Sequence, residues 1–165
     1  MNKLVIILLA ILPIITFSQG LEKKEIAWIS LEKAKLLAKK HNQNILIYFY
    51  KKNCPYCDKM KKETFSKPNV ISTINRYFLP VKINSRSKDT IYYNNVAYSN
   101  QQPIDHGYTF RHDFYAEVAS FNRDGTTQST TPTIALFNSN FKKTALFPGN
   151  KPAELLLRLL KKHIK

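Results

Sequence analysis

The residues in this sequence best suited to chemistry are its only two cysteines, Cys54 and Cys57, which are separated by Pro55 and Tyr56. Helix-forming residues follow from Asp58 onward, and a proline suits the first turn of a helix, where its missing N–H costs nothing. We therefore expect the pair at a helix N-terminus. Backbone N–H groups and the helix dipole lower the pKa of a thiol there from its ordinary value of about 8.5.

Two thiols placed in this way can exchange with disulfides. The thiolate of Cys54 would attack a substrate disulfide, and Cys57, one turn further along the helix, would resolve the mixed disulfide. We expect Pro55 and Tyr56 to set the turn and tune the thiolate. Lysines on both sides of the motif add positive potential, in a chain with 26 Lys and Arg, 11 Asp and Glu and a formal net charge of +15.

The sequence gives less support to other uses of the cysteine pair. Covalent haem attachment requires a histidine directly after the second cysteine, where this chain has Asp58. A structural disulfide across two residues would close too small a loop to stabilise the fold much. A zinc site would need two more ligands, and none of the histidines has a paired spacing close to the cysteines: His41, His106, His112 and His163. We expect no metal and no organic cofactor, and we expect His106 and His112 to lie on the surface.

The elements around the motif alternate between helices and strands, which predicts an α/β architecture with mixed strand directions. The continuous β-branched and aromatic run 45–50 leads directly into the motif and predicts a strand buried on both faces. The full set of predicted elements is helices from Leu31 to Asn42, from Pro55 to Phe65, from Pro68, from Thr109 to Phe121 and from Pro152, and strands over 45–50, 78–83, 133–137 and 141–147.

The segment 84–120 stands apart from this pattern. Residues 84–100 are polar and rich in tyrosine, with no clear period. Thr109 is expected to cap a helix that carries Phe110, Phe114, Val118 and Phe121 on one side. The tyrosines either form a recognition surface or pack onto the core, and the sequence leaves both open.

The N-terminus has the order of a secretory signal peptide. Lys3 is followed by an uncharged apolar run from Leu4 to Thr16 and then by small and polar residues. That run is shorter than the roughly 18 apolar residues that a membrane span needs. We expect a signal peptide over 1–19, a single domain over 20–165, and an exported protein, periplasmic or secreted, without an integral membrane segment in the mature chain. Because the basic residues are spread over several helices, nucleic-acid binding is not expected.

The strand 45–50, the Cys-Pro-Tyr-Cys turn, the run Thr131-Pro132-Thr133, the following hairpin and the last helix together resemble the thioredoxin fold. The resemblance covers about residues 26–84 and 121–165. It implies a central mixed sheet flanked by helices, with 84–120 as an insertion before the cis-proline strand. In this fold Pro132 would be cis and would face the cysteines, and the backbone at Thr131 would pair with an extended substrate segment.

Two further runs narrow the resemblance. The lead-in with Trp28 and the run from Lys59 to Phe65 are similar to exported bacterial thioredoxin-like proteins of the thioredoxin-7 type. The chain departs from thioredoxins at two positions: Tyr48 stands where they carry a buried acid, and Asn53 stands where they carry a tryptophan. The proton handling of thioredoxins is therefore not carried over to this chain.

The resemblance implies a thiol–disulfide oxidoreductase of the cell envelope that acts on protein substrates with thiols or disulfides and exchanges electrons with a protein redox partner. The sequence does not give the direction of electron flow. Two alternatives stay open: a non-catalytic thioredoxin-like binding module with a static disulfide, and an envelope dithiol that binds zinc or copper.

Overall fold

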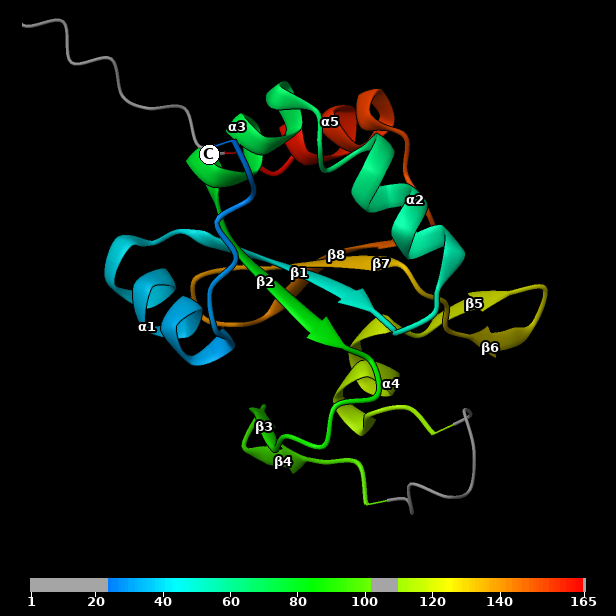
Figure 1. The fold of residues 1–165 in the computed structure, drawn as a ribbon. Coiled ribbons are helices and arrows are strands. Elements are labelled where there is room, and N and C mark those ends of the chain that lie inside the picture. The colour runs from blue at the N-terminus through cyan, green and yellow to red at the C-terminus, as the bar shows by residue number, and fades with distance from the viewer. Residues whose placement is uncertain (1–23, 102–109, 165) are drawn as a thin grey trace, which may run out of the picture.

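The computed structural model describes residues 24–101 and 110–164, which form a layered α/β structure around one four-stranded sheet (Figure 1). The strand order is β2-β1-β7-β8. β1 is parallel to β2 and antiparallel to β7, and β7 is antiparallel to β8. The bounds of these strands are Asn44–Tyr50 for β1, Phe78–Asn84 for β2, Thr133–Phe137 for β7 and Lys143–Pro148 for β8. The expected mixed sheet is confirmed.

Helices cover both faces of the sheet (Figure 1). Two of them, α1 and α4, pack in one apolar cluster, while α3 and α5 pack in a second cluster with Met60 of α2. The helices are α1 Leu31–His41, α2 Pro55–Glu63, α3 Pro68–Tyr77, α4 Asp113–Ala119 and α5 Ala153–Lys161. Within the described residues, no helix is long and apolar enough to cross a membrane.

The central strand β1 joins the two clusters because its side chains alternate between the faces of the sheet. Ile45, Ile47 and Phe49 belong to the cluster under α1 and α4, whereas Leu46 and Tyr48 belong to the cluster under α3 and α5. All five are buried. The strand is therefore buried on both faces, as its sequence predicted.

The segment 84–120 contains regular structure that its sequence did not suggest. Strands β3 Ile91–Tyr93 and β4 Val96–Tyr98 form a hairpin. Its two turn residues, Asn94 and Asn95, have φ values of 50° and 63°, a left-handed conformation that asparagine tolerates better than most residues. The sequence signal that could have predicted this hairpin is the Asn-Asn pair between two short runs of β-branched and aromatic residues.

The helix in this segment is shorter than predicted. It begins at Asp113, after the N-cap residue His112, and ends before Phe121, which starts strand β5. Thr109, the expected cap, lies outside the described residues. Strands β5 Phe121–Arg123 and β6 Thr126–Gln128 form a second hairpin around Asp124-Gly125, and this hairpin is absent from the predicted elements.

The segment 84–120 shares the core of the domain. The aromatic ring of Tyr93 lies 5.5 Å from that of Phe114 and 5.9 Å from that of Phe137 in β7. Phe114 also stacks on Phe141, with ring centroids 6.1 Å apart. Of the tyrosines whose role the sequence left undecided, Tyr93 therefore packs onto the core, while Tyr92 is 62% exposed.

The C-terminal elements differ slightly from their predicted bounds. Strand β8 begins at Lys143 rather than at Phe141, whose φ of 57° places it in the turn. Helix α5 begins at Ala153, after the N-cap residue Pro152, and its buried leucines are Leu156, Leu157 and Leu160.

Candidate active site

The cysteine motif occupies the turn from β1 into α2. Asn53 has a φ of 53°, in the left-handed region. Asparagine adopts this conformation more readily than most residues, which accounts for an asparagine at the position where thioredoxins carry tryptophan. Cys54 is the N-cap of α2, with extended backbone, and Pro55 is the first helical residue. The expected position of Cys54 at a helix N-terminus is therefore observed.

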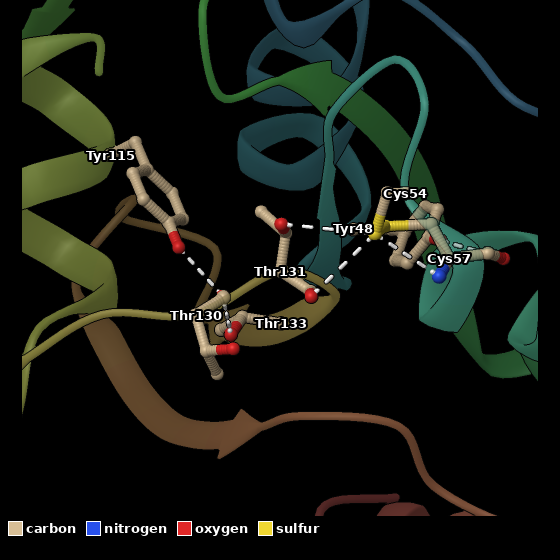
Figure 2. The surroundings of a disulfide bond; sticks show 7 residues. All are labelled: Tyr48, Cys54, Cys57, Tyr115, Thr130, Thr131 and Thr133. Atoms are coloured by element: carbon tan, nitrogen blue, oxygen red, sulfur yellow. Dashed lines mark hydrogen bonds between the residues drawn. A yellow bond between two sulfur atoms is a disulfide. The ribbon is translucent and has the colours of Figure 1, made fainter. Parts of the chain in front are cut away.

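A disulfide joins Cys54 and Cys57, whose Cα atoms are 5.2 Å apart (Figure 2). The backbone N–H of Cys57 donates a hydrogen bond to Sγ of Cys54 at 3.2 Å. The two cysteines are only 3% and 6% exposed, whereas Tyr56 between them is 66% exposed. In the reduced state the same N–H, together with the helix dipole, would favour a thiolate on Cys54.

The loop before β7 lies against the first cysteine (Figure 2). The carbonyl oxygen of Thr131 is 3.6 Å from Sγ of Cys54, and the Thr131 hydroxyl oxygen is 3.8 Å from it. The Thr131–Pro132 peptide bond is cis, and the carbonyl of Pro132 accepts a hydrogen bond from the N–H of Gly149 at 2.8 Å. The structure thus brings Cys54, Thr131 and Pro132 together.

A tyrosine from α4, which the sequence analysis did not single out, holds the start of this loop. The hydroxyl of Tyr115 donates to the carbonyl of Thr130 at 2.6 Å, and the hydroxyl of Thr133 donates to the same oxygen at 2.6 Å (Figure 2). Tyr115 is 1% exposed, and the Arg111 guanidinium lies 5.9 Å from its ring centroid. Burial raises the pKa of the Tyr115 phenol, so it remains a hydrogen-bond donor.

The histidine that precedes α4 is buried, contrary to our expectation of a surface residue. His112 is fully buried, and its Nδ1 accepts a hydrogen bond from the N–H of Phe114 at 3.0 Å. Its Nε2 lies 2.7 Å from the carbonyl oxygen of Asp89 and donates to it. His112 thus caps α4 and joins it to the preceding loop. The prediction failed because the ring takes the capping role usually filled by Ser, Thr, Asp or Asn. His106 lies outside the described residues.

Tyr48 fills the space beside the second cysteine that an acid occupies in thioredoxins. Its ring packs against Phe65, with centroids 4.9 Å apart, and against Trp28 at 5.9 Å. Its hydroxyl is 3.5 Å from the carbonyl oxygen of Cys57. Burial, and then the charge of Asp58, raise the pKa of the Tyr48 phenol well above its ordinary value. Tyr48 is therefore neutral near pH 7 and has no basic site for a thiol proton.

In the described part of the chain, no three His, Cys, Asp or Glu side chains gather where they could hold a metal ion. Both sulfur atoms of the motif are bonded to each other. The chemistry that this geometry offers is thus exchange of the Cys54–Cys57 disulfide with other thiols and disulfides.

Removal of the Tyr115 hydroxyl tests whether α4 holds the loop. We expect Tyr115→Phe to lower the free energy of unfolding by about 1 kcal/mol and to speed amide hydrogen exchange at 131 and 133–134, because one buried hydrogen bond to Thr130 is lost. Tyr92→Phe, which removes a hydroxyl from an exposed ring, is the matched control. Equal exchange rates in all three proteins would contradict this role.

The buried phenol of Tyr48 predicts a loss of stability at alkaline pH. The unfolded chain ionises Tyr48 near pH 10.0, while the folded chain keeps it neutral. Relative to Tyr48→Phe, wild-type stability should be constant below about pH 9 and fall above pH 10 by at most about 1.4 kcal/mol per pH unit. Urea unfolding of both proteins from pH 7 to about 11 measures this difference. Wild-type stability that does not fall relative to Tyr48→Phe across this range would contradict a raised pKa of the phenol.

Comparisons with known proteins agree with this fold. Among solved structures, a DsbH oxidoreductase matches with a TM-score of 0.58 at 12% sequence identity and covers 90% of both chains. A thioredoxin from Thermus thermophilus matches with a TM-score of 0.56 at 16% identity, over 84% of this chain and 87% of that one. The oxidised C-terminal domain of Neisseria meningitidis DsbD matches with a TM-score of 0.50 at 14% identity, over 79% and 90%.

At these identities the structural matches show the fold alone. No curated protein sequence matches the chain significantly. The model of the thioredoxin-like domain family, however, matches residues 31–164, which include the cysteine turn and the cis-proline. The chain therefore belongs to the thioredoxin-like domain family.

Proposed function

We propose that this protein is a thiol–disulfide oxidoreductase of the cell envelope that exchanges disulfides with protein substrates. The fold and the cysteine pair support a thiol–disulfide oxidoreductase in general. The observation that carries the proposal is the setting of Cys54: its sulfur accepts a backbone N–H at the start of α2 and lies 3.6 Å from the Thr131 carbonyl. These are the two requirements for a stabilised thiolate beside a backbone segment that can hold a substrate.

In the reducing direction, both thiols first lose their protons to solvent or base. The Cys54 thiolate attacks one sulfur of a substrate disulfide, which forms a Cys54–substrate disulfide and releases the other substrate sulfur as a thiolate. The Cys57 thiolate then attacks Sγ of Cys54, forms the Cys54–Cys57 disulfide and releases the second substrate thiolate. Two electrons pass from the protein to the substrate, whose thiolates take up two protons. The oxidising direction is the reverse.

The substrate is proposed to lie along Thr131 and Pro132. Because Thr131 comes just before β7, its backbone can pair with an extended segment in the manner of strand addition. Pro55 fixes the first helical turn, and Tyr56, whose side chain is exposed, follows it between the two cysteines. In this proposal both residues tune the thiolate. This alignment places a substrate sulfur next to Cys54.

The location and the redox partner are part of the proposal. Export depends on the signal peptide expected over 1–19, which lies outside the described residues. An envelope protein with a single dithiol exchanges its electrons with another protein, since the pair turns over only when a partner restores it. No bound cofactor is required by the steps above.

A static disulfide in a non-catalytic binding module is the second candidate. It is favoured by the burial of both cysteines, which are 3% and 6% exposed. The two candidates differ in the reactivity of Cys54, because a static disulfide needs no nucleophile.

Single cysteine variants separate the candidates. We expect reduced Cys57→Ser to form a stable mixed disulfide with a peptide disulfide, because Cys54 attacks and nothing resolves the product. Cys54→Ser should form at least about a hundredfold less adduct in the same time, because the sulfur that contacts Thr131 is that of Cys54 and because Cys57 lacks the N-terminal position. Intact-mass spectrometry counts the adducts, and thermal unfolding shows that both variants are folded. A folded Cys57→Ser variant that forms no adduct would contradict the oxidoreductase.

A further inference from the structure

A hollow of about 590 Å³ opens beside the second cysteine, and neither Cys54 nor Thr131 lines it. Cys57 lines it, as do the aromatic rings of Trp28, Tyr48 and Phe65. The rings pack edge to face, with Trp28 and Phe65 centroids 5.7 Å apart. The hollow therefore has an apolar wall that reaches the disulfide. Its volume is in the range of ligand-binding pockets, which is about 300–1,000 Å³.

The rim of this hollow is strongly cationic. Five lysines line it, against two carboxylates, those of Glu25 and Asp58. We call the hollow the lysine cavity, and its five lysines are Lys24, Lys51, Lys52, Lys61 and Lys82. None of the five forms an ion pair with a described residue, since the ion pairs there join Lys35 to Glu32 and Lys59 to Glu63. Their charges are thus available to a partner.

The strands and the cysteine turn explain why the lysines meet at this place. Lys82 stands opposite Tyr48 in the parallel register of β1 and β2, so both side chains lie on the face of the sheet that α2 covers. Lys51 and Lys52 follow the end of β1, and Lys61 lies on α2. Strand β2, the turn after β1 and helix α2 therefore each contribute lysines to one hollow.

The cationic surface continues around the turn that precedes Cys54. A neighbouring hollow of about 490 Å³ shares Lys51, Lys52 and Asn53 with the lysine cavity and adds Arg86. On the other side of the disulfide, the loop that contacts Cys54 consists of uncharged residues from Ser129 to Thr133. The Arg111 guanidinium donates to the carbonyl of Ser129 at 3.1 Å, so one cation stands beside this loop. The disulfide thus lies between a loop with one neighbouring arginine and a cavity lined by five lysines.

We propose that the lysine cavity docks an Asp- and Glu-rich polypeptide segment of the protein whose disulfide reacts with Cys54. The inference rests on the proposed function and names the class of its partner. Opposite charges across an interface speed encounter and select partners, which fits the charge of this rim. A polypeptide suits the site better than a membrane, because a chain can enter a concavity and place an apolar side chain against Trp28 and Phe65.

Two matched peptides test the inference. Each contains the same intramolecular disulfide, flanked in one by three Glu residues and in the other by three Gln residues. In a single turnover, the reduced protein should reduce the Glu peptide with a second-order rate constant about tenfold higher than that for the Gln peptide at low salt. This ratio should fall towards one near 1 M salt, where charges are screened beyond about 3 Å. The ratio cancels any change in the intrinsic reactivity of Cys54.

Reversal of the charge of two lysines tests whether the preference for the Glu peptide arises at the lysine cavity. Lys52→Glu/Lys61→Glu should bring the ratio of Glu to Gln peptide to one or below, because both lysines are exposed at the cavity rim. Lys39→Glu/Lys40→Glu is the matched control, since it makes the same charge change on exposed residues of α1, and it should keep most of the ratio.

The outcomes separate the inference from the proposed function. Equal rates for the two peptides, or an equal loss of the ratio in both double variants, would overturn the inference, while reduction of the Gln peptide would still support the oxidoreductase. Failure to reduce either peptide would overturn the proposed function itself. Binding to vesicles of anionic lipid that Lys52→Glu/Lys61→Glu abolishes, with an unchanged peptide ratio, would assign the rim to a membrane surface and also overturn the inference.

Discussion

Burial of β1 on both faces is the constraint on which the geometry around the disulfide depends. Ile45, Ile47 and Phe49 are fully buried, so the strand cannot shift its register without exposing one apolar face. The same register pairs Phe49 with Thr133 and Tyr50 with Asn84. One end of β1 therefore sets the positions of the cysteine turn, the cis-proline loop and the start of the segment 84–120 together.

Tyr48, which stands where thioredoxins carry a buried acid, changes which groups can influence the ionisation of the two thiols. With a neutral phenol where thioredoxins carry an acid, no buried carboxylate faces Cys57 from β1. Stabilisation of a thiolate then falls to the backbone N–H at the start of α2 and to the lysines around it. The same lysines form the proposed docking rim, so charge near the disulfide would serve both the reactivity of Cys54 and the choice of partner.

The sequence was sufficient where local signals and burial agree. Helix α1 runs from Leu31 to His41 with Asn42 as its C-cap, which agrees with the predicted bounds, and the run 45–50 predicted the buried strand. It was insufficient where tertiary contacts decide: His112 caps a helix because Asp89 holds its ring, and Tyr115 matters because the chain brings Thr130 to it. The cysteines and Pro132 were found from their spacing and a resemblance, whereas the lysine cavity joins residues far apart in the sequence.

The measurement that tests the central claim most directly is the redox equilibrium of the Cys54–Cys57 pair against a dithiothreitol couple, with the oxidised and reduced forms separated after acid quenching. The proposed oxidoreductase predicts one reversible two-electron transition that is reached from both directions and gives the same potential, because an accessible Cys54 thiolate exchanges with the couple. A pair that stays oxidised in the folded protein, and is reduced only after unfolding, would contradict it and would identify the disulfide as structural.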